Sequence, residues 1–116
     1  MLKSYKELIV WQKAMVLVEE IYKVKLPREE IYGLTSQIRR AAVSIPSNIA
    51  EGQQRKNRKE FIQFLRIAFG SSAELDTQII IAKNLYPGLN FDKAATILEE
   101  VGKMLNSILR TLETKN

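Results

Sequence analysis

The chain has 116 residues, 46% of them apolar, which fits a single domain over residues 1–116 with a substantial hydrophobic core. It contains no cysteine and no histidine, so disulfides, thiolate zinc sites and the commonest general base are excluded, and we expect no enzymatic activity, metal or cofactor. The formal net charge of +5 favours a polyanionic partner, such as nucleic acid, an acidic protein or an anionic membrane surface.

A first helix is predicted over about residues 4–25. Two apolar series recur there at spacings of three and four residues, one beginning at Leu8 and the other at Val10. Pro27 ends this helix, because the residue before a proline is disfavoured in the α region. The segment lacks the apolar run and cleavage site of a signal peptide, and no window reaches the ~18–20 apolar residues of a membrane span. We therefore expect a cytoplasmic protein without a membrane role.

A second helix is predicted over about residues 30–51, and Gly52 stands where a helix C-terminal glycine is common. Its apolar face is formed by Leu34, Ile38, Ala41, Ile45 and Ile49. Pro46 removes one backbone hydrogen bond, so we predict a kink in a continuous helix. The alternative is a helix that stops at Ile45 and is followed by a separate turn.

A third helix is predicted from Asn57 to Leu85, opened by a capping box in which Asn57 and Glu60 satisfy free backbone amides. A fourth begins near residues 90–92, after a proline and a glycine stop the third. Its predicted core stripe is Ala94, Ile97, Val101, Met104, Ile108 and Leu112. No alternating pattern competes and the loops are short, so we predict an all-α, antiparallel up-down four-helix bundle with its second helix kinked at a proline.

The apolar faces of the first and third helices are wider than one stripe. Deep burial within one small bundle would explain this width, but a bundle of four helices does not easily surround one of them. We therefore favour a homo-oligomer, because an exposed patch of this size would promote aggregation. The predicted interface residues are Trp11, Ile62, Phe69 and Ile80. At helical spacing, the aromatic residues are expected to pack in a core rather than stack on bases.

Positive charge concentrates in the turn between the second and third helices. The predicted nucleic-acid-binding residues are Arg55, Lys56, Arg58 and Lys59 of this turn, together with Arg39, Arg40 and Arg66. Flexible cations beside the N-terminus of a long helix suit phosphate groups. Two simpler explanations stay open: the turn is a solvated loop, and the arginine pair forms ion pairs with Glu51 or Glu74.

The segment "YGLTSQIRRAAVSIPSNIAEG" (residues 32–52), a pattern of arginine, aromatic and small residues over residues 55–78, and the opening "LIVWQKAM" resemble a bacterial four-helix-bundle family encoded within intervening sequences of 23S ribosomal RNA. Matching positions include Arg39, Arg40, Asn48, Glu51, Gly52 and Arg55. The resemblance implies a homo-oligomer, a pentameric ring. The family is similar to the accessory protein of diversity-generating retroelements, a basic pentamer that binds nucleic acid and a reverse transcriptase.

Two functions follow from these features. The first is a non-enzymatic, oligomeric nucleic-acid-binding protein that contacts structured RNA, in preference to DNA, through phosphates and with weak sequence preference. The second is a protein-interaction or scaffold module, in which charge steers an acidic protein partner and the apolar faces bind it.

Overall fold

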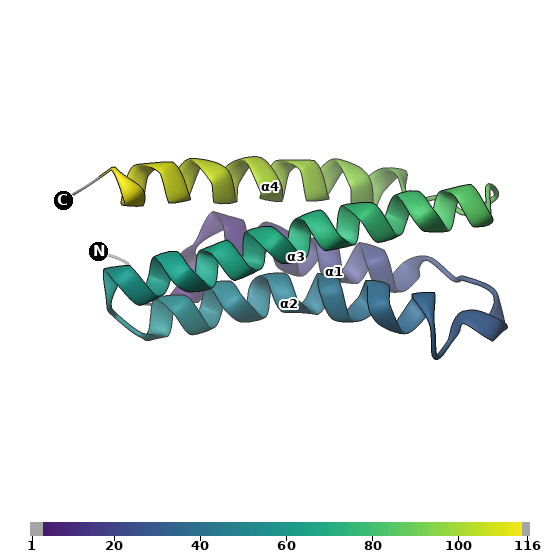
Figure 1. Ribbon diagram of the computed structural model, residues 1–116, viewed down its shortest axis with the longest axis horizontal. Helices are drawn as coiled ribbons and strands as arrows, with labels where there is room; N and C mark the ends of the chain where they lie inside the picture. Colours follow the sequence, from purple (N-terminus) through teal and green to yellow (C-terminus); the bar gives the residue numbers. More distant parts are fainter. Residues whose placement is uncertain (1–3, 115–116) are drawn as a thin grey trace.

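The polypeptide forms four long helices, as Figure 1 shows. The computed structural model describes residues 4–114, and the two ends of the predicted 1–116 domain lie outside this range. The helices are α1 (Ile9–Lys23), α2 (Leu34–Gln54), α3 (Arg58–Leu85) and α4 (Asp92–Glu113), with short 3-10 turns η1 (Tyr5–Glu7) and η2 (Arg28–Glu30). The described residues include no strand, so the all-α prediction is confirmed.

The helices pack as a bundle of 47 × 22 × 20 Å in which each helix contacts two others. Within the described chain α1 contacts α2 and α4, and α3 contacts the same two helices, with no contact across either diagonal. This arrangement is consistent with an up-down bundle joined by short loops. Figure 1 shows the α2–α3 turn at one end of the bundle and the other two connections at the opposite end.

The core is built from one buried stripe on each helix. In α1 the series that begins at Val10 is buried, whereas Met15 and Tyr22 of the other series are 38% and 41% exposed. The predicted stripe of α2 is confirmed apart from its first residue, Leu34, which is half-buried. In α3 the periodicity predicts a stripe from Phe61 to Ala82, and it is confirmed apart from Phe61, which is half-buried: the buried members are Leu65, Ala68, Ser72, Leu75, Ile79 and Ala82. In α4 the prediction is confirmed at Ala94 and Val101 and wrong elsewhere, because Leu98, Leu105 and Leu109 are buried where Ile97, Met104 and Ile108 were predicted. The predicted residues that flank this stripe pack against its edge, because two adjacent apolar rows share one helix face.

Pro46 lies inside α2, which continues to Gln54. The continuous helix is therefore the correct alternative, and the kink at this proline stays a prediction. The side chain of Pro46 is buried, and Ile45 and Ile49 on either side are fully buried. Burial of these residues offsets the lost backbone hydrogen bond, since a fully buried aliphatic side chain contributes about 1.5–3 kcal/mol.

The helix α2 begins at Leu34, about one turn later than the predicted start near residue 30, and Glu30 ends the separate 3-10 turn η2. The carboxylate of Glu30 replaces a side-chain cap: one oxygen accepts a hydrogen bond from the Leu34 amide at 3.1 Å, and the other accepts from the Tyr86 hydroxyl at 2.5 Å. These bonds, that from Tyr86 foremost, lower the pKa of Glu30, and the same carboxylate raises the pKa of Tyr86. The contact joins the start of α2 to the end of α3.

Candidate nucleic-acid interface

The α2–α3 turn is formed by Arg55, Lys56 and Asn57. Asn57 caps α3 as predicted, because its side-chain oxygen accepts a hydrogen bond from the Glu60 amide at 3.0 Å. The carboxylate of Glu60 lies 3.5 Å from the Arg55 guanidinium. Lys56 has a φ of 54°, the only positive value among the described non-glycine residues. A left-handed residue commonly follows a helix, but glycine is the usual choice because a side chain is strained there.

Gly52 does not end α2, so its predicted role as a helix C-terminal glycine is wrong. It is buried within the helix, two residues before its end. A Cβ atom at this position would lie 2.6 Å from the Cβ of Phe64 and 3.1 Å from Cδ1 of Phe61. The glycine therefore allows α2 and α3 to approach closely just before the turn, and this approach sets where the cations after it lie.

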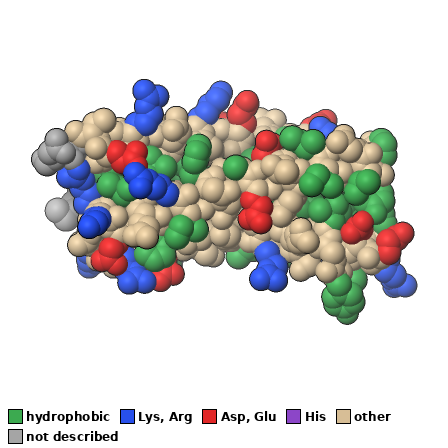
Figure 2. Space-filling model, viewed as in Figure 1, with side chains coloured by type: hydrophobic (Ala, Val, Ile, Leu, Met, Phe, Trp, Pro, Cys, Tyr) green, Lys and Arg blue, Asp and Glu red, His purple; other side chains and the backbone are tan. Residues whose placement is uncertain are grey.

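We define the basic corner as Arg55, Lys56, Arg58, Lys59 and Arg66. Figure 2 shows Lys and Arg side chains gathered, with acidic ones between them, toward the end of the molecule that carries the α2–α3 turn. Arg55 is held by acidic and aromatic neighbours: it lies 2.9 Å from Glu51, and its guanidinium carbon is 5.1 Å from the centre of the Phe64 ring.

Two further arginines of the basic corner connect α3 to the end of α4. Arg58 donates a hydrogen bond to the Leu112 carbonyl at 2.9 Å, where the negative end of the helix dipole favours a cation. Arg66 forms an ion pair with Glu113, in which its Nε and Nη2 atoms both donate to the same carboxylate oxygen, Nε at 2.8 Å. These contacts span 54 and 47 residues of sequence, so no local pattern could reveal them.

Lys56 and Lys59 are exposed and form no ion pair with any residue in the described range 4–114. The five cations of the corner are therefore opposed by three carboxylates, those of Glu51, Glu60 and Glu113. An excess positive charge remains, carried by side chains that are free to reach outward.

Arg39 and Arg40 lie apart from the basic corner. Arg40 lies within α2 and Arg55 directly follows its end, fifteen residues later, which corresponds to about 22 Å along the helix axis. Arg39 stacks on the Tyr22 ring, with its guanidinium carbon 4.4 Å from the ring centre. Neither arginine forms an ion pair within the described chain, and Glu51, one of the two predicted partners, pairs with Arg55 instead.

The four predicted interface residues differ in exposure. Trp11 and Ile62 are half-buried and pack against the core, and the Trp11 ring meets Tyr5 edge to face at 5.3 Å between centroids. Phe69 and Ile80 are 39% and 52% exposed. The expectation that Phe69 is a core residue is therefore wrong, whereas Phe91, which the sequence did not single out, is fully buried.

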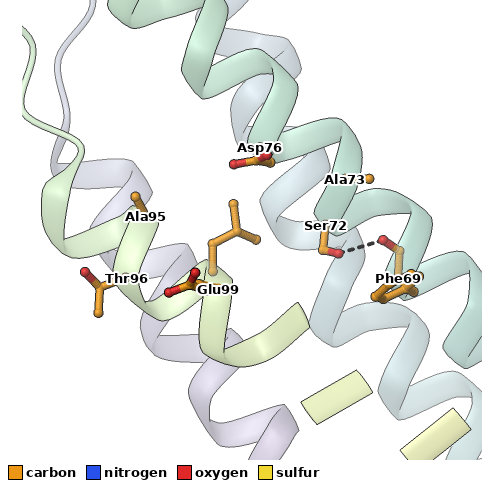
Figure 3. Close-up of a pocket in the computed structure, with 8 residues that line it drawn as sticks. Phe69, Ser72, Ala73, Asp76, Ala95, Thr96 and Glu99 are labelled. Atoms are coloured by element: carbon orange, nitrogen blue, oxygen red, sulfur yellow. Dashed lines mark hydrogen bonds between the residues drawn. The ribbon is translucent and has the colours of Figure 1, made fainter. Parts of the chain in front are cut away.

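A groove of about 550 Å³ runs between α3 and α4 (Figure 3). Its apolar lining is Phe69, Ala73, Ala95 and Leu98, and its polar lining is Ser72, Asp76, Thr96 and Glu99. Ser72 donates to the Phe69 carbonyl at 2.6 Å, so its hydroxyl is already satisfied. The groove thus offers an apolar floor with an acidic rim.

Neither a membrane crossing nor a metal site is evident in the described part of the chain. None of its helices combines the length and hydropathy that a crossing requires. Between residues 4 and 114, Asp and Glu side chains form no group of three that could hold a metal ion.

Residues 6–107 match the model of the family described as 23S rRNA-intervening sequence protein. The chain belongs to this family. The match covers all of α1, α2 and α3 and most of α4, including the whole basic corner and the glycine at the α2–α3 approach. No curated protein matches the sequence.

Proposed function

We propose that this member of the 23S rRNA-intervening sequence protein family is a non-enzymatic homo-oligomer, a pentamer, that binds structured RNA in the cytoplasm through phosphates at its basic corner. The observation that carries the proposal is the pair of exposed, unpaired lysines, Lys56 and Lys59, on either side of the start of α3. Phosphates favour such a place, because flexible cations combine there with the positive end of a helix dipole.

The paired arginines of the corner add to this surface. The side chains of Arg55 and Arg66 are 46% and 64% exposed, and exposed ion pairs contribute only about 0–1 kcal/mol. Such an arginine can therefore exchange a carboxylate for a phosphate at little cost. Arg39 and Arg40 also lie on α2, but they extend the positive surface only when the RNA spans about 22 Å of this helix.

The strained backbone of Lys56 supports a functional role for its side chain. A non-glycine residue in the left-handed region costs on the order of 1–3 kcal/mol, and such residues gather at functional sites. Glycine would remove this cost at the same position. The presence of a cation there is explained if the cation binds a ligand.

Self-association would multiply the effect of each corner. Phe69 and Ile80 expose apolar surface on α3, which a second copy of the chain can cover. Several corners on one assembly bind a long polyanion together, and binding at the second corner becomes intramolecular. We favour RNA over DNA as the ligand because the description of the family names 23S rRNA.

The test is the salt dependence of RNA binding. We expect log affinity to fall linearly with log salt, with a slope of about 0.7–0.9 for each phosphate neutralised. Replacement of Arg55, Lys56, Arg58 and Lys59 by alanine should flatten this slope. The matched control replaces Lys25, Lys83, Lys93 and Lys103, which are exposed and lie elsewhere, with the same change in net charge. Equal slopes for the two variants would remove the basic corner from the proposal.

The α3–α4 groove favours a second candidate function, a protein-interaction module. Its apolar floor can receive side chains of a partner protein, and Arg66 of the basic corner lies one helical turn before the lining residue Phe69, where positive charge can steer an acidic partner. A protein partner that stays bound after nuclease treatment would support this function over RNA binding.

A further inference from the structure

A polar hollow of about 370 Å³ lies between α2 and α3, away from the basic corner. It is lined by Gln37, Arg40, Ala41 and Ser44 from α2 and by Glu74 from α3. Its volume falls in the range of about 300–1,000 Å³ that is typical of small-ligand sites. The small side chain of Ala41 opens the hollow, and a 2.8 Å hydrogen bond between the hydroxyls of Ser44 and Ser71 holds the two helices together beside it.

Arg40 contributes hydrogen-bond donors to this hollow and Glu74 contributes acceptors, and the side chains of both are without a partner. Both are exposed, and neither forms a hydrogen bond or an ion pair with another residue of the described chain, each other included. The guanidinium has only donors, arranged as a planar fork, whereas the carboxylate has only acceptors. One turn after Glu74, the side-chain oxygen of Gln78 is buried without a partner, on a residue that is 7% exposed. Unpartnered donors and unpartnered acceptors therefore both lie between α2 and α3.

We propose that this hollow binds an unpaired guanine base of the RNA, an inference that rests on the proposed function. Guanine carries two adjacent donors, N1–H and the N2 amino group, beside two adjacent acceptors, O6 and N7. The two oxygens of Glu74 accept from the donors, and the fork of Arg40 donates to the acceptors, a bidentate contact that is common in base recognition. Single-stranded bases are the usual target of sequence-specific RNA binding, because they can leave the stack and enter a hollow.

The other bases match the pair of side chains less well. Uracil has one ring N–H and no amino group, so it leaves one carboxylate oxygen without a donor. Cytosine and adenine each offer one amino group as their donor, which again fills one oxygen. Only guanine saturates both side chains at once. Discrimination of about 5- to 150-fold is therefore expected for one bidentate pair. Phosphate contacts at the basic corner carry little sequence preference, and the guanine site adds a preference for one unpaired base.

The experiment has two arms, so that failure of base recognition is separate from failure of phosphate binding. In the first, free guanosine, adenosine and cytidine are titrated into the full chain and the amide resonances of Gln37, Ala41 and Ser44 are followed by NMR. Nucleosides carry no phosphate, so this arm does not depend on the basic corner. We expect shifts with guanosine that are absent or much smaller with the other two, and that disappear in the Glu74→Gln variant.

The second arm compares an all-uridine RNA nonamer with three nonamers in which the central uridine is replaced by guanosine, adenosine or cytidine. We expect the guanosine oligomer to bind about 5- to 150-fold more tightly than the others. Glu74→Gln should abolish this preference but leave affinity for the all-uridine oligomer equal to or above that of the wild type. Asp76→Asn is the matched control, since it makes the same charge change on α3 but in the other groove.

The outcomes separate the two proposals. Guanosine shifts without oligomer binding would retain the base site and overturn the phosphate surface. Oligomer binding with equal affinity for every central base, or a guanosine preference that survives Glu74→Gln, would overturn the base site alone. Equal shifts with all three nucleosides would do the same.

Discussion

The two ends of the bundle show how differently charged and apolar side chains are used. At the end with the α2–α3 turn, three arginines are tied to neighbours and the lysines Lys56 and Lys59 are free. At the other end, Ile80, Ile81 and Leu85 of α3 are 52%, 43% and 59% exposed, with no described partner to cover them. Figure 2 shows Lys and Arg side chains gathered toward one end and a larger hydrophobic patch, with acidic side chains beside it, toward the other.

The number of charged or apolar residues at each end of the bundle therefore does not measure how much charge or apolar surface is available for binding. The charged end contains many cations, but most of them stabilise contacts between helices, so the free charge is smaller than the sequence suggests. The apolar end contains side chains that the core has no room for, so its apolar surface is larger than a buried stripe requires. The first end therefore suits a polyanion, and the second suits self-association.

The largest effect is expected from a charge in the apolar end. Ile80→Glu should weaken self-association by at least about 30-fold, because burial of a residue at the centre of an interface typically contributes 2 kcal/mol or more. The side chain is half-exposed, so the monomer fold should be retained. Sedimentation velocity over a concentration series measures the change. Ser107→Glu, on an exposed position of α4, is the control; equal assembly of both variants would contradict the assignment.

The next effect concerns the packing that supports the charged end. Gly52→Ala should destabilise the fold by about 1–3 kcal/mol, because the added methyl group would lie against the Cβ of Phe64 and force the helices apart. Gly70→Ala meets open space in the middle of α3 and should be stabilising by up to about 1 kcal/mol. Urea denaturation of the two variants gives both values. A neutral Gly52→Ala would show that the α2–α3 approach is looser than the structure indicates.

Lys56→Gly distinguishes a functional lysine from an incidental one. Removal of the side chain from a left-handed residue should raise stability by about 1 kcal/mol. The same change should lower the salt slope of RNA binding by about 0.7–0.9, since one phosphate contact is lost. Opposite signs for stability and binding are the expected pattern. A variant that is more stable and binds RNA with an unchanged slope would mean that Lys56 is not part of the interface.

The smallest effect is expected at the Glu30–Tyr86 contact of the apolar end. The pKa of Glu30 lies below its usual value of 4.5, so the contact stabilises the fold above that pH and its contribution is lost as pH falls through the lower, folded-state pKa. The pKa of Tyr86 lies above its usual value of 10.0, so the contribution is also lost as pH rises through that higher pKa. Tyr86→Phe should therefore lower the melting temperature at neutral pH and match the wild type at both extremes. A pH-independent difference would contradict this linkage.

Much of the fold was predictable from sequence because it depends on local signals. Helical periodicity located all four helices, and Asn57 marked the start of α3. Periodicity could not choose between adjacent apolar rows, which is why three positions of the predicted α4 stripe lie one residue before the buried ones, whereas Ala94 and Val101 are correct. The expected helix end at Gly52 failed for a related reason: a glycine is also selected where two helices touch, and only the tertiary structure shows the contact with Phe64.

The candidate site was predictable in composition but not in geometry. The sequence identified the cations of the basic corner, but the partners of Arg58 and Arg66 lie in α4, far along the chain. The hollow at Arg40 had no sequence signal, because it depends on the register of α2 against α3. Glu74 was considered there only as an ion-pair partner of the arginines, a contact that the structure does not form.

Native mass spectrometry of the purified protein, before and after nuclease treatment, tests the central claim most directly. The account predicts a homo-oligomer that carries RNA before treatment and remains assembled, without RNA, afterwards. A protein that is monomeric at high concentration, and that binds neither RNA nor DNA in low-salt buffer, would contradict it.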